Sequence, residues 1–111
     1  VAIGNLYQDL KEHEASEEVV FLMFTEFGRR VQENGSGTDH GSGSVAFVIG
    51  DQVEGGLYGE YPSLEPDKLD QGDLRWNNDF RSTYATLLEK WMGLDSKPIL
   101  RDAYEQFDFI K

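Results

Sequence analysis

Two short apolar runs, separated by a polar segment rich in glycine, constrain the fold of this chain most. The runs are Val19–Phe24 and Val45–Ile49, and β-branched and aromatic residues make up most of both. A short continuous run of this kind is typical of a strand buried on both faces, as in a parallel sheet covered by helices. We therefore expect strands over residues 19–25 and 45–49 at the centre of an α/β domain.

Two helices are expected to pack on this sheet. Residues 2–14 place four apolar side chains on one helical face, namely Ile3, Leu6, Tyr7 and Leu10. Residues 79–92 show a clearer helical period, with apolar side chains at i, i+4, i+7, i+8 and i+11 from Phe80. A residue of Asn77–Asp79 can cap its start, and Gly93 lies where a C′ residue ends a helix. We interpret the stripe as core packing.

Composition and charge exclude several classes of protein. Ten basic and 21 acidic residues give a net charge of −11, which repels phosphate backbones and anionic lipids. We therefore expect neither nucleic acid nor a membrane surface as a partner. The chain has no cysteine, hence no disulfide and no thiolate metal site, and no apolar run approaches the roughly 18 residues of a membrane span. A length of 111 residues fits a single domain or part of a larger one.

Most side chains suited to chemistry lie between the two apolar runs. Glu26 follows the first run, and Asp39 and His40 belong to the predicted loop Asn34–Ser44 that leads to the second. In open α/β sheets, ligands bind beyond the carboxyl ends of the strands. An Asp-His pair in such a place can bind a metal or transfer protons, and it can equally complete a surface network.

Two further pairs have alternative interpretations. Arg29 and Arg30 can clamp an anion such as phosphate or sulfate, or they can pair with the surrounding acids. Asp9 and His13 stand four residues apart on the first predicted helix, as two metal ligands can. In so acidic a chain we favour a solvated helix face for this second pair.

Four segments in one order carry a family resemblance. They are FTEFGRRVQENGSGTDHG, AFVIG, GGLYGEYPSL and DFRSTYATLLEKWMG. Together they resemble the C-terminal end of the bacterial domain-of-unknown-function family 1501, over nearly the whole chain. That family is similar in fold to the alkaline phosphatase and sulfatase superfamily, a central sheet sandwiched by helices with metal sites at the strand ends. The resemblance implies that residues 1–111 form one domain, which is the C-terminal fragment of a larger alkaline-phosphatase-like domain. It also implies that the protein is periplasmic or exported.

The resemblance also implies roles for particular residues. Superfamily enzymes place an Asp-His metal pair after a strand like that of residues 19–25, where this chain has Glu26-Phe27. Glu26 can thus be a ligand, whereas Phe27 cannot. His40 holds the position of a further metal histidine, and Asp39 would be a ligand or orient His40. The implied cofactor is a divalent metal, namely zinc, calcium or manganese.

The function implied by the resemblance is metal-dependent hydrolysis of phosphate or sulfate esters. Arg29 or Arg30 would hold the small anionic ester. The nucleophilic Ser or Thr of the superfamily comes from segments that would precede this chain, so the fragment is expected to be inactive. The alternative is a non-catalytic binding or structural module that retains the fold. A partial sheet exposes a strand edge and apolar faces, so we expect a homodimer or a higher oligomer.

Overall fold

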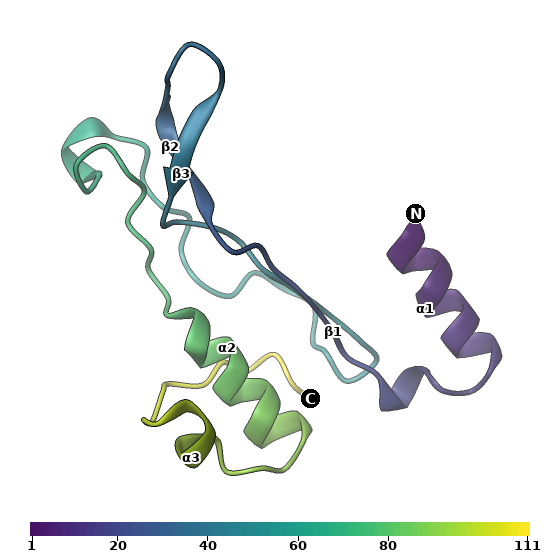
Figure 1. The fold of residues 1–111 in the computed structure, drawn as a ribbon. Coiled ribbons are helices and arrows are strands. Elements are labelled where there is room, and N and C mark those ends of the chain that lie inside the picture. Colours follow the sequence, from purple (N-terminus) through teal and green to yellow (C-terminus); the bar gives the residue numbers. More distant parts are fainter.

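The structure, a computed structural model that describes residues 1–111, arranges helices around two separate antiparallel ribbons (Figure 1). One ribbon lies at the centre, a second projects away from it, and helices lie at both ends of the molecule. The elements in order are α1 (Ala2–Glu12), η1 (Ser16–Glu18), β1 (Phe21–Met23), β2 (Gly28–Glu33), β3 (Thr38–Gly41), β4 (Phe47–Ile49), η2 (Pro66–Lys68), α2 (Phe80–Thr86), η3 (Leu87–Trp91) and α3 (Ser96–Leu100).

The two apolar runs form strands that pair with each other, in the direction opposite to the one expected. β1 and β4 are antiparallel, with Phe21 opposite Ile49 and Met23 opposite Phe47. The prediction of a mostly parallel sheet is therefore wrong, because both ribbons are antiparallel. A parallel pair needs a crossover connection, usually a helix. Here the chain between β1 and β4 forms a second ribbon instead and then returns.

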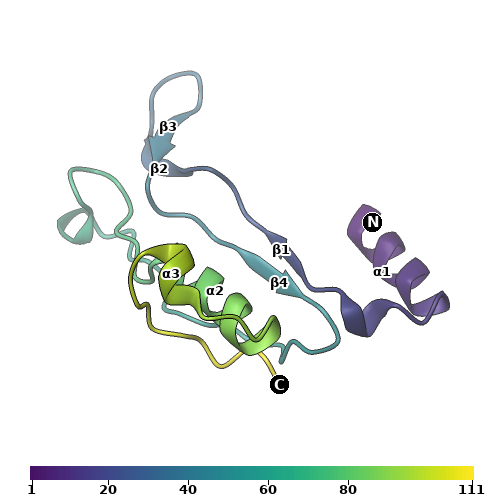
Figure 2. The same cartoon turned by 60° about the horizontal axis from the view of Figure 1, so that its bottom comes forward.

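Burial of this central ribbon also differs from the expectation. In the second apolar run, Val45 is 70% exposed and Phe47 is 55% exposed, so this run is not buried on both faces. Helix α2 and the C-terminal segment lie along one side of the ribbon (Figure 2). There the rings of Phe24 and Tyr84 meet edge to face, with their centroids 6.4 Å apart. A covering layer on one side only leaves many of the apolar side chains of the runs at the surface.

The predicted loop Asn34–Ser44 contains a strand of its own. β2 and β3 form an antiparallel hairpin in which Glu33 pairs with Thr38 and Gly28 with Gly41. At its turn, the amide of Asn34 donates to the carbonyl of Gly37, 2.8 Å away. The residues of β3, TDHG, show no apolar alternation, because neither face of this hairpin covers a core. Hydrophobic periodicity therefore could not predict it.

The helix predicted over residues 79–92 is confirmed, with a change of helical type along its length. Asp79 caps α2 by accepting a hydrogen bond from the amide of Arg81 at 2.9 Å. The helix continues as the π-helical turn η3, and Gly93 follows with a φ of +69°. That conformation ends the helix, as expected for a C′ glycine.

The apolar stripe of this helix is less buried than core packing requires. Phe80 is 70% exposed, whereas Tyr84, Leu87, Leu88 and Trp91 are half-buried. The fully enclosed positions are Ala85 and Thr86. The stripe therefore packs in part, and its first turn remains open to solvent.

The C-terminal segment packs against α2 and η3 through both polar and apolar contacts. The Glu89 carboxylate accepts hydrogen bonds from the Ser96 hydroxyl at 2.5 Å and from the Gln106 amide, which attaches α3 and the tail. These hydrogen bonds, Ser96 first, lower the pKa of Glu89. Phe109 is 4% exposed and stacks with Phe107 at a centroid distance of 5.9 Å.

Helix α1, predicted over residues 2–14, is confirmed and ends at Glu12. It is attached to the end of β4 through Asp51, whose carboxylate accepts hydrogen bonds from the hydroxyls of Tyr7 and Ser16. Lys11 adds an ion pair to the same carboxylate at 3.5 Å. One acidic residue thus holds most of the polar contact between α1 and the rest of the molecule.

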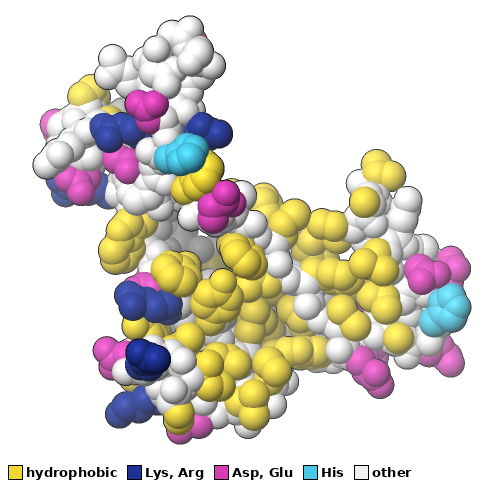
Figure 3. All heavy atoms as spheres, viewed as in Figure 1, with side chains coloured by type: hydrophobic (Ala, Val, Ile, Leu, Met, Phe, Trp, Pro, Cys, Tyr) yellow, Lys and Arg dark blue, Asp and Glu magenta, His cyan; other side chains and the backbone are white.

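The molecule is open and exposes much apolar surface. Its radius of gyration is 16.7 Å, compared with about 13 Å for a compact domain of this length. Only Ala85 and Phe109 are buried hydrophobic residues. Apolar side chains cover a broad area of the centre of the face seen in Figure 3 and continue toward α1. None of the helices has the length and apolar character required to cross a membrane.

Candidate functional site

The base of the β2–β3 hairpin brings together two segments that the sequence analysis singled out. Arg29 of β2 lies opposite His40 of β3 in the strand register. The Phe27 ring stacks on the His40 ring, with centroids 3.6 Å apart and planes 20° from parallel. The Arg29 guanidinium lies 5.4 Å from the Phe27 ring centroid. The side chains of Phe27, Arg29 and His40 therefore share one face of the hairpin.

Glu26 lies at the bend that precedes β2, at the same end of the hairpin. Its side chain is exposed and makes no hydrogen bond or ion pair in the structure. The neighbouring Thr25 hydroxyl donates to the carbonyl of Phe27 at 2.7 Å and lies 2.9 Å from the Ser44 hydroxyl. These contacts fix the backbone around Glu26 and leave its carboxylate available to a ligand.

Asp39 lies on the other face of β3 from His40, since successive strand residues point to opposite faces. Its carboxylate accepts a hydrogen bond from the side-chain amide of Asn34 at 2.7 Å. This bond ties Asp39 to the hairpin turn. Its predicted role as a metal ligand, or as the residue that orients His40, stays a prediction.

The two arginines have different surroundings. Arg29 donates to the carbonyl of Thr38 at 2.7 Å, across the hairpin. Arg30 donates to the carbonyl of Gln71, which attaches the hairpin to the turn of residues 70–73. Anion binding by either arginine stays a prediction, and the structure gives both of them partners in the hairpin and the adjoining turn.

Asp73 is a structural residue of this region that the sequence analysis did not identify. Its carboxylate accepts hydrogen bonds from the Ser42 amide at 2.9 Å and from the Ser42 hydroxyl at 3.1 Å. The Ser42 amide is the largest cause of the lowered pKa of Asp73, and the charge of Arg30 adds to it. Asp73 ends a tight turn in which Gly72 has a φ of +84°. The DQGD sequence of residues 70–73 is the only local signal for this turn.

The Glu26 carboxylate and the His40 imidazole are groups that bind zinc and similar metals, but two ligands do not complete a metal site. The structure contains no group of three or more His, Asp or Glu side chains that could hold a metal ion. Glu26 and His40 therefore remain predicted ligands. A metal site here needs ligands in addition to those that the structure gathers.

The Asp9–His13 pair on α1 has the geometry of a solvated helix face. The Nδ1 atom of His13 lies 2.8 Å from the Asp9 carbonyl oxygen and 3.5 Å from its carboxylate. Their side chains are 73% and 64% exposed, and no third donor joins them.

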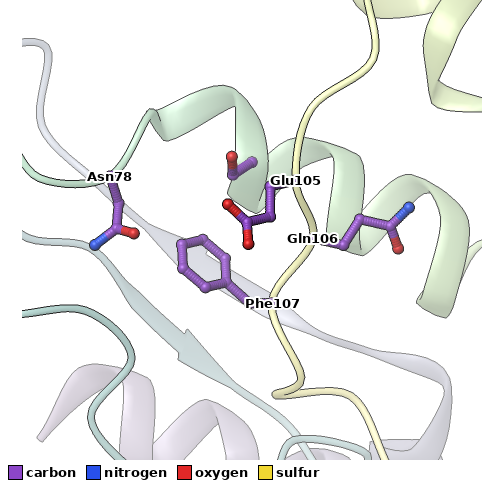
Figure 4. A pocket seen from close by; sticks show the side chains of 5 residues that line it. Asn78, Glu105, Gln106 and Phe107 are labelled. Atoms are coloured by element: carbon purple, nitrogen blue, oxygen red, sulfur yellow. The ribbon is translucent and has the colours of Figure 1, made fainter.

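A small cavity lies between α2 and the C-terminal segment (Figure 4). Its volume is about 100 Å³, and it is lined by Asn78, Ser82, Glu105, Gln106 and Phe107. Ligand pockets are usually several hundred Å³, so this cavity suits a few water molecules better than a substrate.

Comparison with protein families identifies the chain. The family model described as "Protein of unknown function (DUF1501)" matches residues 1–102. The comparisons with curated proteins and with solved structures gave no match. The predicted family is thereby confirmed, whereas the fold and chemistry of the alkaline phosphatase and sulfatase superfamily rest on resemblance alone. Because the match extends over far more than half of its length, the chain belongs to the DUF1501 family.

Proposed function

We propose that this chain supplies one part of a divalent-metal site for the hydrolysis of phosphate or sulfate esters, with Glu26 and His40 as ligands. One observation carries the proposal: the register that pairs Arg29 with His40 brings the segment after β1 to the histidine of β3. The order of these motifs is the one that the superfamily resemblance implies. The reaction class is inferred from the resemblance by analogy. The hairpin explains how the segment with Glu26 comes to lie beside the strand with His40.

The side chains at the hairpin base suit this role. The stack on Phe27 restrains the ring of His40, so that fewer orientations compete with the one that binds. Glu26 has a carboxylate without a partner. Arg29 lies on the same face as His40 and can orient an anionic ester through its remaining N–H groups. A bound divalent metal would supply Lewis-acid activation of a nucleophile and of the ester oxygens.

The proposed site is composite. Two ligands without a third cannot hold a catalytic metal tightly, and the structure gathers no third ligand. We therefore place the remaining ligands and the nucleophile in other segments of a larger domain. Asp39 and Arg30 act in this scheme by holding the hairpin, through Asn34 and Gln71 respectively.

A non-catalytic binding or structural module is the second candidate, and it has its own supporting observation. Phe27 occupies the place where superfamily enzymes carry a second ligand, and it stacks directly on His40. In a module of this kind the stack would serve only to stabilise the hairpin.

Paramagnetic Mn²⁺ distinguishes the two candidates. Amide and side-chain resonances of Glu26 and His40 are expected to broaden first when Mn²⁺ is added to the isotope-labelled chain. Glu26→Gln and His40→Ala should each abolish that broadening. His13→Ala is the matched control, since His13 is the other of the two histidines. Broadening that is confined to α1, or that persists in both hairpin variants, would refute the metal-site proposal.

The composite nature of the site is tested by activity. The isolated chain is expected to release no p-nitrophenol from p-nitrophenyl phosphate or p-nitrophenyl sulfate, with or without Zn²⁺ or Mn²⁺. Turnover that is lost in His40→Ala would show that this chain holds a complete site and that no other segment is needed.

A further inference from the structure

A second concave surface lies outside the hairpin. Residues 60–63 and 75–77 form its two walls, and η2 closes a third side. Its volume is about 370 Å³, within the range of sites that hold small ligands. We call this surface the aromatic groove.

Two large aromatic side chains of the aromatic groove are turned toward solvent. Tyr61 is 83% exposed and Trp76 is 62% exposed, although both rings have large apolar faces. The side-chain amide of Asn77 donates to the carbonyl of Glu60, which joins the two walls. The rings are thus carried by backbone segments that are held together, and they stay available for a ligand.

Polar side chains surround these rings. Glu60 and Asp67 contribute two negative charges, and Lys68 and Arg75 contribute two positive charges, so the groove has no net formal charge. Lys68 also pairs with Glu65 at 2.6 Å. A ligand with many phosphate or sulfate groups finds no excess of positive charge here, whereas a neutral ligand with several hydroxyl groups finds both donors and acceptors.

We propose that the aromatic groove binds a neutral oligosaccharide, with Tyr61 and Trp76 as the stacking surfaces. A pyranose ring has an apolar C–H face that packs on an aromatic ring, and its hydroxyl edge forms hydrogen bonds with neighbouring polar side chains. Proline-rich peptides also dock in aromatic-lined grooves. Besides Tyr61, six of the nine lining residues carry charged, hydroxyl or amide side chains, which favour the hydroxyl groups of a sugar over proline rings. The assignment is independent of the proposed metal site.

Calorimetric titration of the full chain with cellohexaose, mannohexaose and hexaacetylchitohexaose tests the proposal. At least one of these is expected to bind and to change the tryptophan fluorescence. Tyr61→Ala and Trp76→Ala should each weaken binding about tenfold, the loss expected from one stacking contact. Trp76→Phe should retain most of the affinity because it keeps an aromatic face.

Phe80→Ala is the matched control, since Phe80 is an aromatic residue outside the groove and is 70% exposed. It should leave affinity unchanged. Far-UV circular dichroism shows whether each variant folds. If Trp76→Ala does not fold, Tyr61→Ala alone tests the proposal, because it removes a ring that is 83% exposed. The proposal is overturned if no sugar binds at millimolar concentration, or if both groove variants bind as the parent chain does. Binding of a polyproline decapeptide in place of all three sugars would also overturn it.

Discussion

Gly28 illustrates at the scale of single residues how closely the hairpin base is packed. A Cβ atom at this position would lie 1.6 Å from the Gly43 carbonyl oxygen, far inside van der Waals contact. Both glycines are buried, and the obstacle is backbone rather than a flexible side chain. The two chain segments that carry Glu26 and His40 can therefore approach only where one of them has no side chain.

Gly28→Ala is expected to destabilise the closed hairpin by about 2 kcal/mol, because either the β2–β3 pairing or the Gly43 segment must shift. Amide hydrogen exchange of β2 and β3 measures this change as a lower opening free energy. Gly55→Ala is the control, since no atom lies within 4 Å of the added Cβ, and it should change stability by less than about 0.5 kcal/mol. Equal protection in both variants would contradict the packing argument.

At the scale of the element, α2 depends on the N-cap residue that precedes it. The Asp79 carboxylate accepts a hydrogen bond from the Arg81 amide at 2.9 Å and pairs with the Arg81 guanidinium at 2.7 Å. These contacts, the side-chain hydrogen bond first, lower the pKa of Asp79. Asp79→Ala should destabilise the helix by about 1 kcal/mol, the usual effect of losing an N-cap.

Thermal unfolding of the two variants Asp79→Ala and Asp79→Asn, followed by far-UV circular dichroism, measures this effect. Asp79→Asn keeps the acceptor for the Arg81 amide and loses only a partly exposed ion pair, so its midpoint should stay near that of the parent chain. A midpoint for Asp79→Asn as low as that of Asp79→Ala would assign the stabilisation to charge instead of capping.

Docking of α1 is expected to depend on pH through Asp51. The Ser16 hydroxyl and then the Tyr7 hydroxyl lower its pKa. A carboxyl whose folded pKa lies below the unfolded value of about 3.9 contributes stability above that value. The contribution disappears as the pH falls through the folded pKa. The pKa of Tyr7 is raised, mainly by the hydrogen bond to Asp51, so its contribution is present below about pH 10 and is lost above.

Amide hydrogen exchange of α1, corrected for the intrinsic pH dependence of exchange, tests this prediction. Protection should fall below about pH 4 in the parent chain. Asp51→Asn, which removes the titrating group, should show weaker protection of α1 at neutral pH and no further loss on acidification. An identical acid response in both proteins would assign the effect to carboxyls outside the Asp51 cluster.

At the scale of the whole molecule, the exposed apolar surface is the dominant feature. A two-stranded ribbon is marginal by itself, and β1 and β4 form such a ribbon with exposed Met23 and Phe47. Surfaces of this kind are usually covered by another layer or another chain. We propose that the isolated chain covers part of this surface by forming a two-fold dimer.

Light scattering at micromolar concentration should therefore give a mass above that of one chain. The net charge of −11 opposes association, so the dimer should be favoured by added salt, which screens the repulsion. Phe47→Glu should shift the mass toward one chain. Leu57→Glu, at a loop position that is 87% exposed, should have no such effect. A monomer with a cooperative melt at all salt concentrations would refute the prediction.

The sequence by itself determined the helices and the family. Helix formation depends on interactions between residues a few positions apart, so local sequence was enough to predict both helices. The signals were the periodic apolar positions of residues 2–14 and 79–92, and Asp79 and Gly93 at the ends of the second helix. The strand positions of the two apolar runs followed for the same reason, because β-branched and aromatic residues favour extended backbone wherever they pair.

Only the tertiary structure decided how these elements meet. The antiparallel direction of β1 and β4 depends on the path of the chain between them, which no local pattern specifies. The β2–β3 hairpin is stabilised by backbone pairing and a glycine turn with no apolar face, so it leaves no hydrophobic period in the sequence. The sequence could name Glu26 and His40, but the stack of Phe27 on His40 arises from strand register. A one-residue slip in that register would place His40 on the opposite face, which is why the geometry of the site belongs to the fold.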